Sequence, residues 1–151
     1  MSQHGEVPIA KQTFNWLLLI VIVLAMLAVG NVLWMTIEPF KKPDIVTPMP
    51  VEYSVIARGE EQTFLITYTK YDEAEVVGTR TIQCEDGNLV TLTQVRTNLP
   101  LGSGTIHSMP FKIPTKTSLG MCKLVVVVRY EVNPHKVVFG GYETEPFMVV
   151  E

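Results

Sequence analysis

The feature that most constrains this chain of 151 residues is a long stretch without charge, running from Gln12 to Ile37. Within it, residues 14–37 hold 20 hydrophobic side chains among 24 positions. As a helix, these 24 residues reach about 36 Å, enough to cross a hydrocarbon core of roughly 30 Å. The stretch therefore predicts one membrane-spanning helix. Outside it, about 40% of residues are hydrophobic, which is typical of a globular domain.

Two tryptophans mark the ends of this span. Trp16 and Trp34 are 18 residues apart, which places the indoles about 27 Å apart, near the two headgroup boundaries. A cleaved signal peptide is an alternative, since Lys11 precedes the apolar run and small residues follow at 28–30. The run continues to Ile37, however, which is longer than a signal peptide needs and favours an anchor. A buried core helix is a second alternative.

Small and polar side chains in the span suggest a face for self-association. Ala25, Ala28 and Gly30 would let two helices approach closely, and Asn31 could form a hydrogen bond across the contact. A homo-oligomer through the membrane helix is therefore a candidate. The alternative is ordinary membrane-helix composition, because the sequence contains no G-x-x-x-G motif in this region.

Charges flanking the span give a weak indication of orientation. Lys11 and the amino terminus lie on one side, and Lys41 and Lys42 lie on the other, which favours a cytoplasmic C-terminal domain by one charge. Long domains can nevertheless be translocated regardless of such a bias, and two cysteines fit an oxidising compartment. We therefore expect a short cytoplasmic N-terminus at residues 1–13 and an exported, periplasmic or otherwise extracytoplasmic C-terminal domain.

The segment 38–50 contains four prolines, at positions 39, 43, 48 and 50. This density forbids a regular helix and favours extended polyproline II, so the segment is predicted to be a stalk. In the alternative, Ile45 to Pro50 pairs with the following domain as an edge strand.

Residues 51–151 are predicted to form one all-β domain, an antiparallel β-sandwich. Short segments rich in Val, Ile, Thr, Tyr and Phe alternate with turn sequences, and no helical pattern lies among them. The expected strands are 51–57, 63–69, 75–84, 91–95, 105–112, 122–132, 136–141 and 144–150. Turns are expected at 58–61, 85–88, 101–104, 133–134 and 140–141. The fully apolar run 124–128 predicts a central strand that is covered on both faces or pairs broadly.

The two cysteines, Cys84 and Cys122, are separated by 38 residues and lie at the ends of two expected strands. In an exported domain they could form a disulfide that joins the two sheets. By restricting the unfolded chain, such a bond would stabilise the fold by at most about 4 kcal/mol. The alternatives are two buried free thiols, or a pair too far apart to bond.

These cysteines also carry a resemblance. With about 100 residues of strands and the run Cys122, Val126, Tyr130, the region resembles an immunoglobulin-like sandwich. No Trp lies between the cysteines, so that family's disulfide geometry is not carried over. The pattern Tyr130-x-Val132-Asn133-Pro134, followed by residues 143–147, is similar to small, membrane-anchored, immunoglobulin-like proteins of tailed bacteriophages. That likeness implies a bacterial inner membrane and a periplasmic domain.

Reactive groups are scarce, so we expect a protein that is not an enzyme and has no cofactor. No Gly-x-Ser-x-Gly elbow is present. His107 and Met109 are candidate copper ligands, together with Met121, Cys122 and His135, because imidazole and thioether suit Cu(I). The acidic residues at 72, 73 and 75 are weak calcium candidates. Residues 38–151 hold 11 basic and 14 acidic side chains, a balance that disfavours nucleic acid.

The sequence thus predicts a single-pass membrane protein that presents an interaction module. Its partners would be the lipid bilayer and proteins of an envelope complex, which it would serve as a structural or accessory subunit or as a phage-encoded envelope modifier. The candidate binding edges are strand 136–141 and the terminal residues 147–150. The alternatives are a membrane-anchored copper-binding assembly factor and an exported hydrolase.

Overall fold

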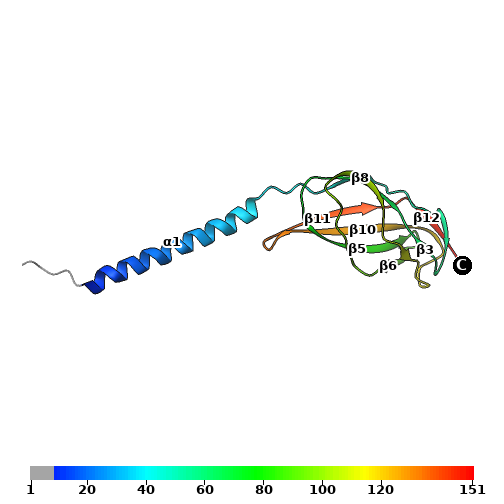
Figure 1. Cartoon of the computed structure of the whole chain (residues 1–151). Coiled ribbons are helices and arrows are strands. Elements are labelled where there is room, and N and C mark those ends of the chain that lie inside the picture. Colours follow the sequence, from blue (N-terminus) through cyan, green and yellow to red (C-terminus); the bar gives the residue numbers. More distant parts are fainter. Residues whose placement is uncertain (1–8) are drawn as a thin grey trace, which may run out of the picture. The chain divides into compact units, whose positions relative to one another are not determined.

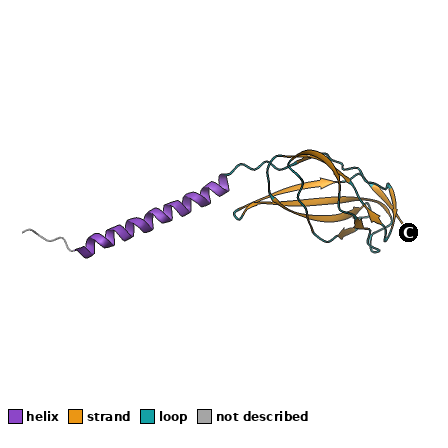
Figure 2. Ribbon diagram, viewed as in Figure 1, coloured by secondary structure: helices purple, strands orange, loops and turns teal. Residues whose placement is uncertain are grey.

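The computed structural model describes the backbone of residues 9–151 and the side chains of residues 15–151. It contains two compact units, a helical one that ends at Glu38 and a β-domain that spans Pro39–Glu151 (Figures 1 and 2). Each unit is described by itself.

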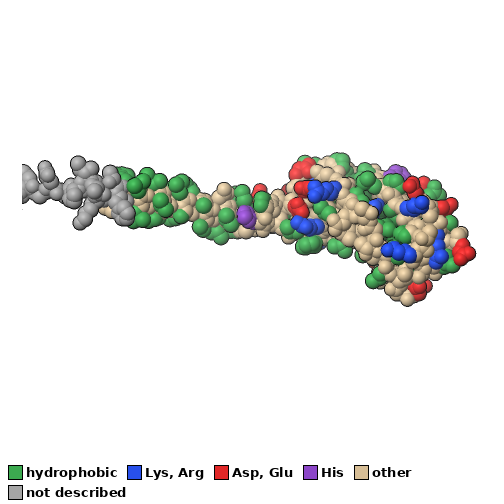
Figure 3. Space-filling model, turned by 90° about the horizontal axis from the view of Figure 1, so that it is seen from below, with side chains coloured by type: hydrophobic (Ala, Val, Ile, Leu, Met, Phe, Trp, Pro, Cys, Tyr) green, Lys and Arg blue, Asp and Glu red, His purple; other side chains and the backbone are tan. Residues whose placement is uncertain are grey.

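The helical unit consists of α1, Ile9–Ile37. Its segment Asn15–Ile37 is long and apolar enough to cross a membrane, and its most apolar window has no buried residues. Apolar side chains cover its surface (Figure 3), so it is not a core helix of the described unit. The helix ends just before Glu38, because a residue that precedes proline disfavours helical dihedrals. Of the expected N-terminus 1–13, residues 1–8 lie outside the described residues and residues 9–13 are helical.

The β-domain is built from twelve named strands. In chain order these are β1 (Asp44–Ile45), β2 (Val55–Ala57), β3 (Glu61–Gln62), β4 (Leu65–Lys70), β5 (Glu75–Cys84), β6 (Leu89–Thr91), β7 (Val95–Arg96), β8 (Gly102–His107), β9 (Phe111–Lys112), β10 (Gly120–Asn133), β11 (Lys136–Glu143) and β12 (Phe147–Val150). The all-β prediction is confirmed for this domain.

Two larger sheets face each other. The smaller has the order β1-β4-β8, and the larger has the order β2-β12-β10-β5-β6, with β11 added beside β10 and β7 beside β5. Strand β10 is central: it pairs with β5 along ten registered positions and with β11 and β12 on its other side (Figure 1). Strands β3 and β9 form a separate short pair.

Side chains of both large sheets meet in one core. Phe64 and Ile66 from the small-sheet side pack in the same cluster as Ile82 and Leu124 from the large sheet. Ile82, Leu124 and Phe147 are fully buried. Alternate residues of β5 contribute to this core. Its even-numbered residues 76, 78, 82 and 84 are buried and lie on the core face.

The predicted stalk at 38–50 is wrong for its C-terminal part. Asp44 and Ile45 pair with β4, and Met49 is buried in the core and bridges to Thr144. The alternative, in which this segment pairs with the domain, is the one found. The extended conformation that the prolines impose suits strand pairing as well as a free spacer, and the apolar side chains of Ile45 and Met49 favour burial.

Further details differ from the sequence-based expectation. The expected strand 91–95 is interrupted between β6 and β7, and the expected strand 105–112 is interrupted between β8 and β9. The pairing is not purely antiparallel, because β12 runs parallel to β2, with Met148 opposite Val55. The turn expected at 101–104 is the beginning of β8. The glycines at 140 and 141 lie inside β11, paired with β10 at positions 128 and 127, and do not form a turn. In contrast, Gly87 has a φ of 86° in the expected turn between β5 and β6.

Cys84 and Cys122 form a disulfide, as predicted. The bond joins directly opposite residues of β5 and β10, which are neighbouring strands of one sheet. The expectation that it would join the two sheets is therefore wrong. It closes one end of the longest strand pair in the domain.

Gly140 occupies a position where no other side chain fits without movement. A Cβ there would lie 2.8 Å from Oη of Tyr142. That hydroxyl is hydrogen-bonded with Tyr130 Oη (3.0 Å) and donates to the Pro43 carbonyl (3.3 Å), so the ring is not free to shift.

We expect Gly140→Ala to lower the free energy of unfolding by about 1–2 kcal/mol, the usual cost of a local overpacking. The matched control is Gly141→Ala, where nothing lies within 4 Å of the added Cβ, and its effect should stay within about 0.5 kcal/mol. Urea unfolding of the two full-length variants, followed by far-ultraviolet circular dichroism, compares them. Equal effects at the two positions would contradict this account of Gly140.

Candidate functional site

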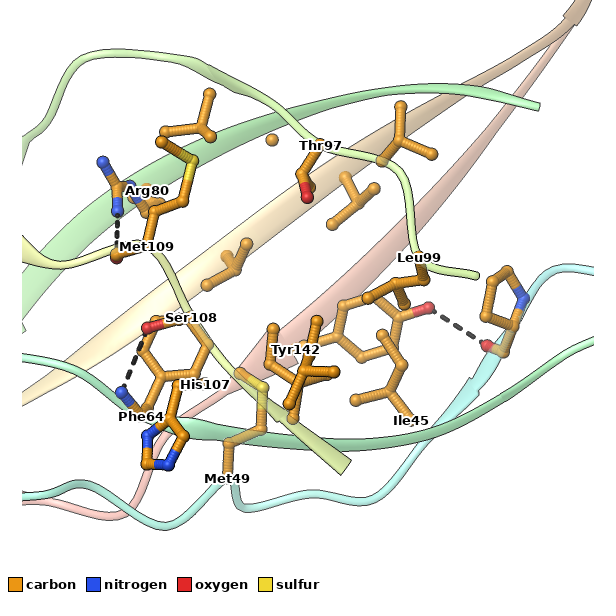
Figure 4. A pocket seen from close by; sticks show the side chains of 18 of the residues that line it. Ile45, Met49, Phe64, Arg80, Thr97, Leu99, His107, Ser108, Met109 and Tyr142 are labelled. Atoms are coloured by element: carbon orange, nitrogen blue, oxygen red, sulfur yellow. Dashed lines mark hydrogen bonds between the residues drawn. The ribbon is translucent and has the colours of Figure 1, made fainter. Parts of the chain in front are cut away.

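An apolar cavity of about 130 Å³ lies between the two large sheets (Figure 4). Ile66 of β4 and Ile106 of β8 line one wall, and Val126 and Val128 of β10 line the other. The exposed residues Thr97 and Met109 also line it, so they mark its opening to solvent. The cavity is therefore an apolar site with access from the surface.

Two cations reach this cavity, and the first is Lys70 at the end of β4. Its side chain is only 1% exposed. The ammonium donates to Glu73 Oε2 (2.9 Å), to Asn98 Oδ1 and to the Leu99 carbonyl (2.8 Å). All three of its protons thus have acceptors. These bonds hold the segment before β8 against β4 and lower the pKa of Glu73, chiefly through the Lys70 hydrogen bond and then through that of Asn98.

The second cation, Arg80 of β5, is much less well paired. Its Nη1 donates to the Met109 carbonyl (3.2 Å), and its guanidinium lies 5.6 Å from the centre of the Phe111 ring. Its Nε is buried and has no hydrogen-bond partner among residues 15–151. No carboxylate in that part of the chain forms an ion pair with it. Burial lowers the pKa of Arg80.

Three other polar side chains of the cavity, Ser108, Tyr130 and Tyr142, bond to one another or to the main chain. Tyr130 and Tyr142 share a hydrogen bond between their hydroxyls, and desolvation by burial raises the pKa of both. Ser108 Oγ accepts from the Phe64 amide at 3.0 Å (Figure 4). Neither of these two hydrogen-bonded pairs places a nucleophile beside a base, and the apolar lining suits contact with an apolar group.

A second feature is the outer edge of β11. This strand pairs with β10 on one side, and within residues 9–151 no strand pairs with its other side. Only its C-terminal end is covered, where Met49 donates to the Glu143 carbonyl (2.9 Å). At eight residues β11 is the longest edge strand, and it carries no proline or charged residue between Val137 and Tyr142. We call Val137–Tyr142 the β11 edge.

The outer face beside the β11 edge is apolar. Phe139 is 64% exposed, and Val127 and Val137 are also exposed. Val127 lies in the run 124–128, which takes the predicted central position and pairs with strands on both sides, although the side chain of Val127 is 48% exposed. The other candidate edge, 147–150, is not available, because β12 pairs with β10 on one side and β2 on the other.

The copper candidates do not converge. Cys122 is bonded to Cys84 and offers no thiolate. His107 and Met109 both line the cavity, but the imidazole and the thioether point in opposite directions (Figure 4). No group of three or more His, Cys, Asp or Glu side chains that could hold a metal occurs within the described residues.

The acidic residues near β5 serve as partners for basic or main-chain groups. Asp72 accepts from the Lys41 amide at 2.6 Å, Glu73 from Lys70, and Glu75 from Arg96 at 3.1 Å. This arrangement does not direct their oxygens to a common point, as a calcium site requires.

The predicted anchor residues Trp16 and Trp34 lie exposed on α1, as do Ala25, Ala28 and Gly30. Asn31 is also exposed on this helix. Nothing in the structure tests a membrane boundary or a self-association face, so both remain predictions.

Sequence reasoning missed Lys70 and Arg80. Both occur at core-facing positions of strands whose other even-numbered residues are mostly apolar. A charged residue at a position where the alternation predicts an apolar one is the signal that could have revealed them. Their partners, Asn98 and the Met109 carbonyl, lie 28 and 29 residues away along the chain, so spacing alone gives no indication of them.

No protein-family model matches the chain, and no curated protein matches it. Among solved structures, a similar chain is that of the Pseudomonas fluorescens alkylpurine DNA glycosylase AlkC bound to DNA containing an abasic site analog. The two are 18% identical, with a TM-score of 0.42 and 80% of this chain covered. The match spans 33% of the glycosylase chain, about a third of its length.

Proposed function

We propose that this chain is a single-pass membrane protein whose β-domain binds an extended segment of a partner protein along the β11 edge. The observation that carries the proposal is an eight-residue edge strand with an unpaired side and an exposed aromatic residue, Phe139. Strand addition at such an edge supplies main-chain hydrogen bonds for affinity and side-chain contacts for specificity.

The β11 edge is better suited to this role than the other free edges. Strand β8 also pairs on one side only, but its exposed side chains, Ser103, Thr105 and His107, are polar. The edges at β1, β2 and β6 are two or three residues long. Proteins usually protect a long apolar edge with charge, proline or a covering segment. The absence of such protection between Val137 and Tyr142 supports a partner at this site.

The proposal includes the location and class of the domain. The helix Asn15–Ile37 would anchor the chain in the bilayer, and the β-domain would be extracytoplasmic, because disulfides persist in oxidising compartments. We further propose an immunoglobulin-like class, supported by two facing sheets, although a disulfide within one sheet departs from the inter-sheet bond of antibody domains. A role in an envelope complex, including one altered by a phage, fits this arrangement.

Site-specific photocrosslinking in native membranes tests the proposal. A photoreactive amino acid at position 137, on the β11 edge, should give a crosslinked product with a partner. The same group at position 101 is the control, because Leu101 is 55% exposed but lies outside the strands. Mass spectrometry of the product would identify the partner, including a second copy of this chain.

A charge on the β11 edge should reduce the yield of that crosslinked product. Phe139 is exposed, so Phe139→Lys should leave the stability of the domain within about 0.5 kcal/mol of the wild type. The lysine would nevertheless disfavour pairing at the edge, and the product from position 137 should decrease at least about fivefold. Equal products from positions 137 and 101, or a product that Phe139→Lys does not reduce, would refute binding at this edge.

A further inference from the structure

From the cavity between the sheets, we infer a second binding site, independent of the β11 edge, for a small anionic amphiphile: a carboxylate bound by Arg80 with a short alkyl chain in the cavity. This class of ligand follows from two observations, the apolar lining and the single under-paired cation at the opening. Each observation selects one end of the ligand.

The cavity selects an alkyl chain of limited length. Its walls are aliphatic, with Ile66 and Ile106 facing Val126 and Val128. An apolar cavity of about 150 Å³ accepts benzene, so one of about 130 Å³ fits a chain of roughly five carbons. Each methylene that enters is worth about fourfold in affinity, and this gain should stop once the cavity is full.

Arg80 selects the carboxylate. Its Nη1 bonds to the Met109 carbonyl, while its Nε has no partner within the described part of the chain. A carboxylate matches the fork of a guanidinium and would supply the missing counter-charge. Because Met109 is exposed and bonded to Arg80, the cation is beside the opening, where a headgroup remains close to water while its chain enters.

The other cation of the cavity does not compete for this headgroup. Lys70 already donates to Glu73, Asn98 and Leu99, which satisfies its three protons. The site therefore has one anion-binding position, and the orientation of the ligand is fixed.

The test uses the full chain in phosphatidylcholine nanodiscs, with ¹³C-labelled isoleucine methyl groups observed by NMR. Hexanoate should shift the signals of Ile66 and Ile106 but not that of Ile113, which is buried in the core outside the cavity lining. Affinity should rise about fourfold per carbon from butanoate to hexanoate and level off by octanoate. Acetate and hexylamine are the controls that lack the chain or reverse the headgroup charge.

Two kinds of variant separate the contribution of the Arg80 contact to affinity from the contribution of the alkyl chain in the cavity. Arg80→Gln should weaken hexanoate about tenfold and leave hexanol unchanged, whereas Arg80→Lys should restore part of the loss. Val126→Phe, or Ile106→Phe from the facing sheet, should fill the cavity and abolish both ligands, with the unfolding midpoint confirming that the variant is folded. Equal affinity for acetate and hexanoate, an unaffected Arg80→Gln variant, or no shift at 50 mM hexanoate would overturn the inference.

Discussion

Replacing both cysteines with serine should lower the free energy of unfolding of the β-domain by about 4 kcal/mol. The bond closes a loop with a sequence separation of 38, and the loop-entropy relation gives this value for a loop of about that length. A domain of about 110 residues has a free energy of unfolding of about 5–15 kcal/mol, so losing the disulfide would remove a large share of the stability of the domain.

The effect should be concentrated in β5 and β10. These strands pair at ten positions from Cys84 opposite Cys122 to Glu75 opposite Glu131, and the disulfide fixes one end of this ladder. Hydrogen exchange of the full chain, before and after reduction, measures the protection of residues 75–84 and 120–133. Both tryptophans lie in α1, so fluorescence of the indoles would not report on this domain.

The control is the doubly substituted variant treated with the same reductant. Reduction should reduce protection of the wild type and leave the Cys84→Ser/Cys122→Ser variant unchanged. A difference below about 1 kcal/mol between the oxidised and reduced wild type would contradict the prediction. It would also weaken the proposal that the β-domain is extracytoplasmic, because that proposal rests on the disulfide.

Local patterns predicted the elements that depend on local chemistry. The uncharged stretch predicted the apolar helix, and a composition typical of strands, bounded by turn sequences, predicted β5 with the observed bounds of 75–84. The turn at 85–88 followed from its glycine. Each of these rests on residues within one element, where side-chain periodicity and backbone preference act directly.

Pairing between segments that are distant in the sequence was harder to predict from the sequence. Gly140 and Gly141 resemble a turn in the sequence, yet they lie in β11 and pair with Val128 and Val127. At Gly140 the missing side chain leaves space for the ring of Tyr142. The prolines of 39–50 indicate extended backbone but do not say whether it is free or paired. Likewise, the two cysteines indicated a bond without indicating whether it joins two sheets or two neighbouring strands. Contacts between distant residues decide all three.

The features of the candidate site divide in the same way into those predicted from local sequence and those set by long-range contacts. The strand 136–141 was a predicted edge, but only the sheet order reveals that β11 has a free side while β12 has none. Lys70 and Arg80 were not expected in an apolar core. Their surroundings are opposite, since Lys70 has three acceptors and Arg80 has one carbonyl, and this contrast is a property of the packed structure alone.

The second large effect is expected at Lys70. Lys70→Ala should lower the free energy of unfolding by about 3 kcal/mol, because it removes a buried stem and leaves the Leu99 carbonyl and Asn98 without their donor. Lys70→Met retains the stem and should cost about half as much. Lys116→Ala, at an exposed lysine, is the matched control and should remain within about 0.5 kcal/mol. Urea unfolding of the full chain measures all three.

The Lys70 variants should also change the response to acid. Hydrogen bonds from Lys70 and Asn98 lower the pKa of Glu73 in the folded protein, relative to about 4.3 for an unfolded glutamate. A lowered folded pKa means that the ionised carboxylate stabilises the fold above about pH 4.3, and that this contribution disappears as the pH falls toward the folded pKa. Lys70→Met should therefore lose less stability than the wild type between pH 5 and pH 3. Parallel pH profiles for the two proteins would show that Lys70 does not act through Glu73.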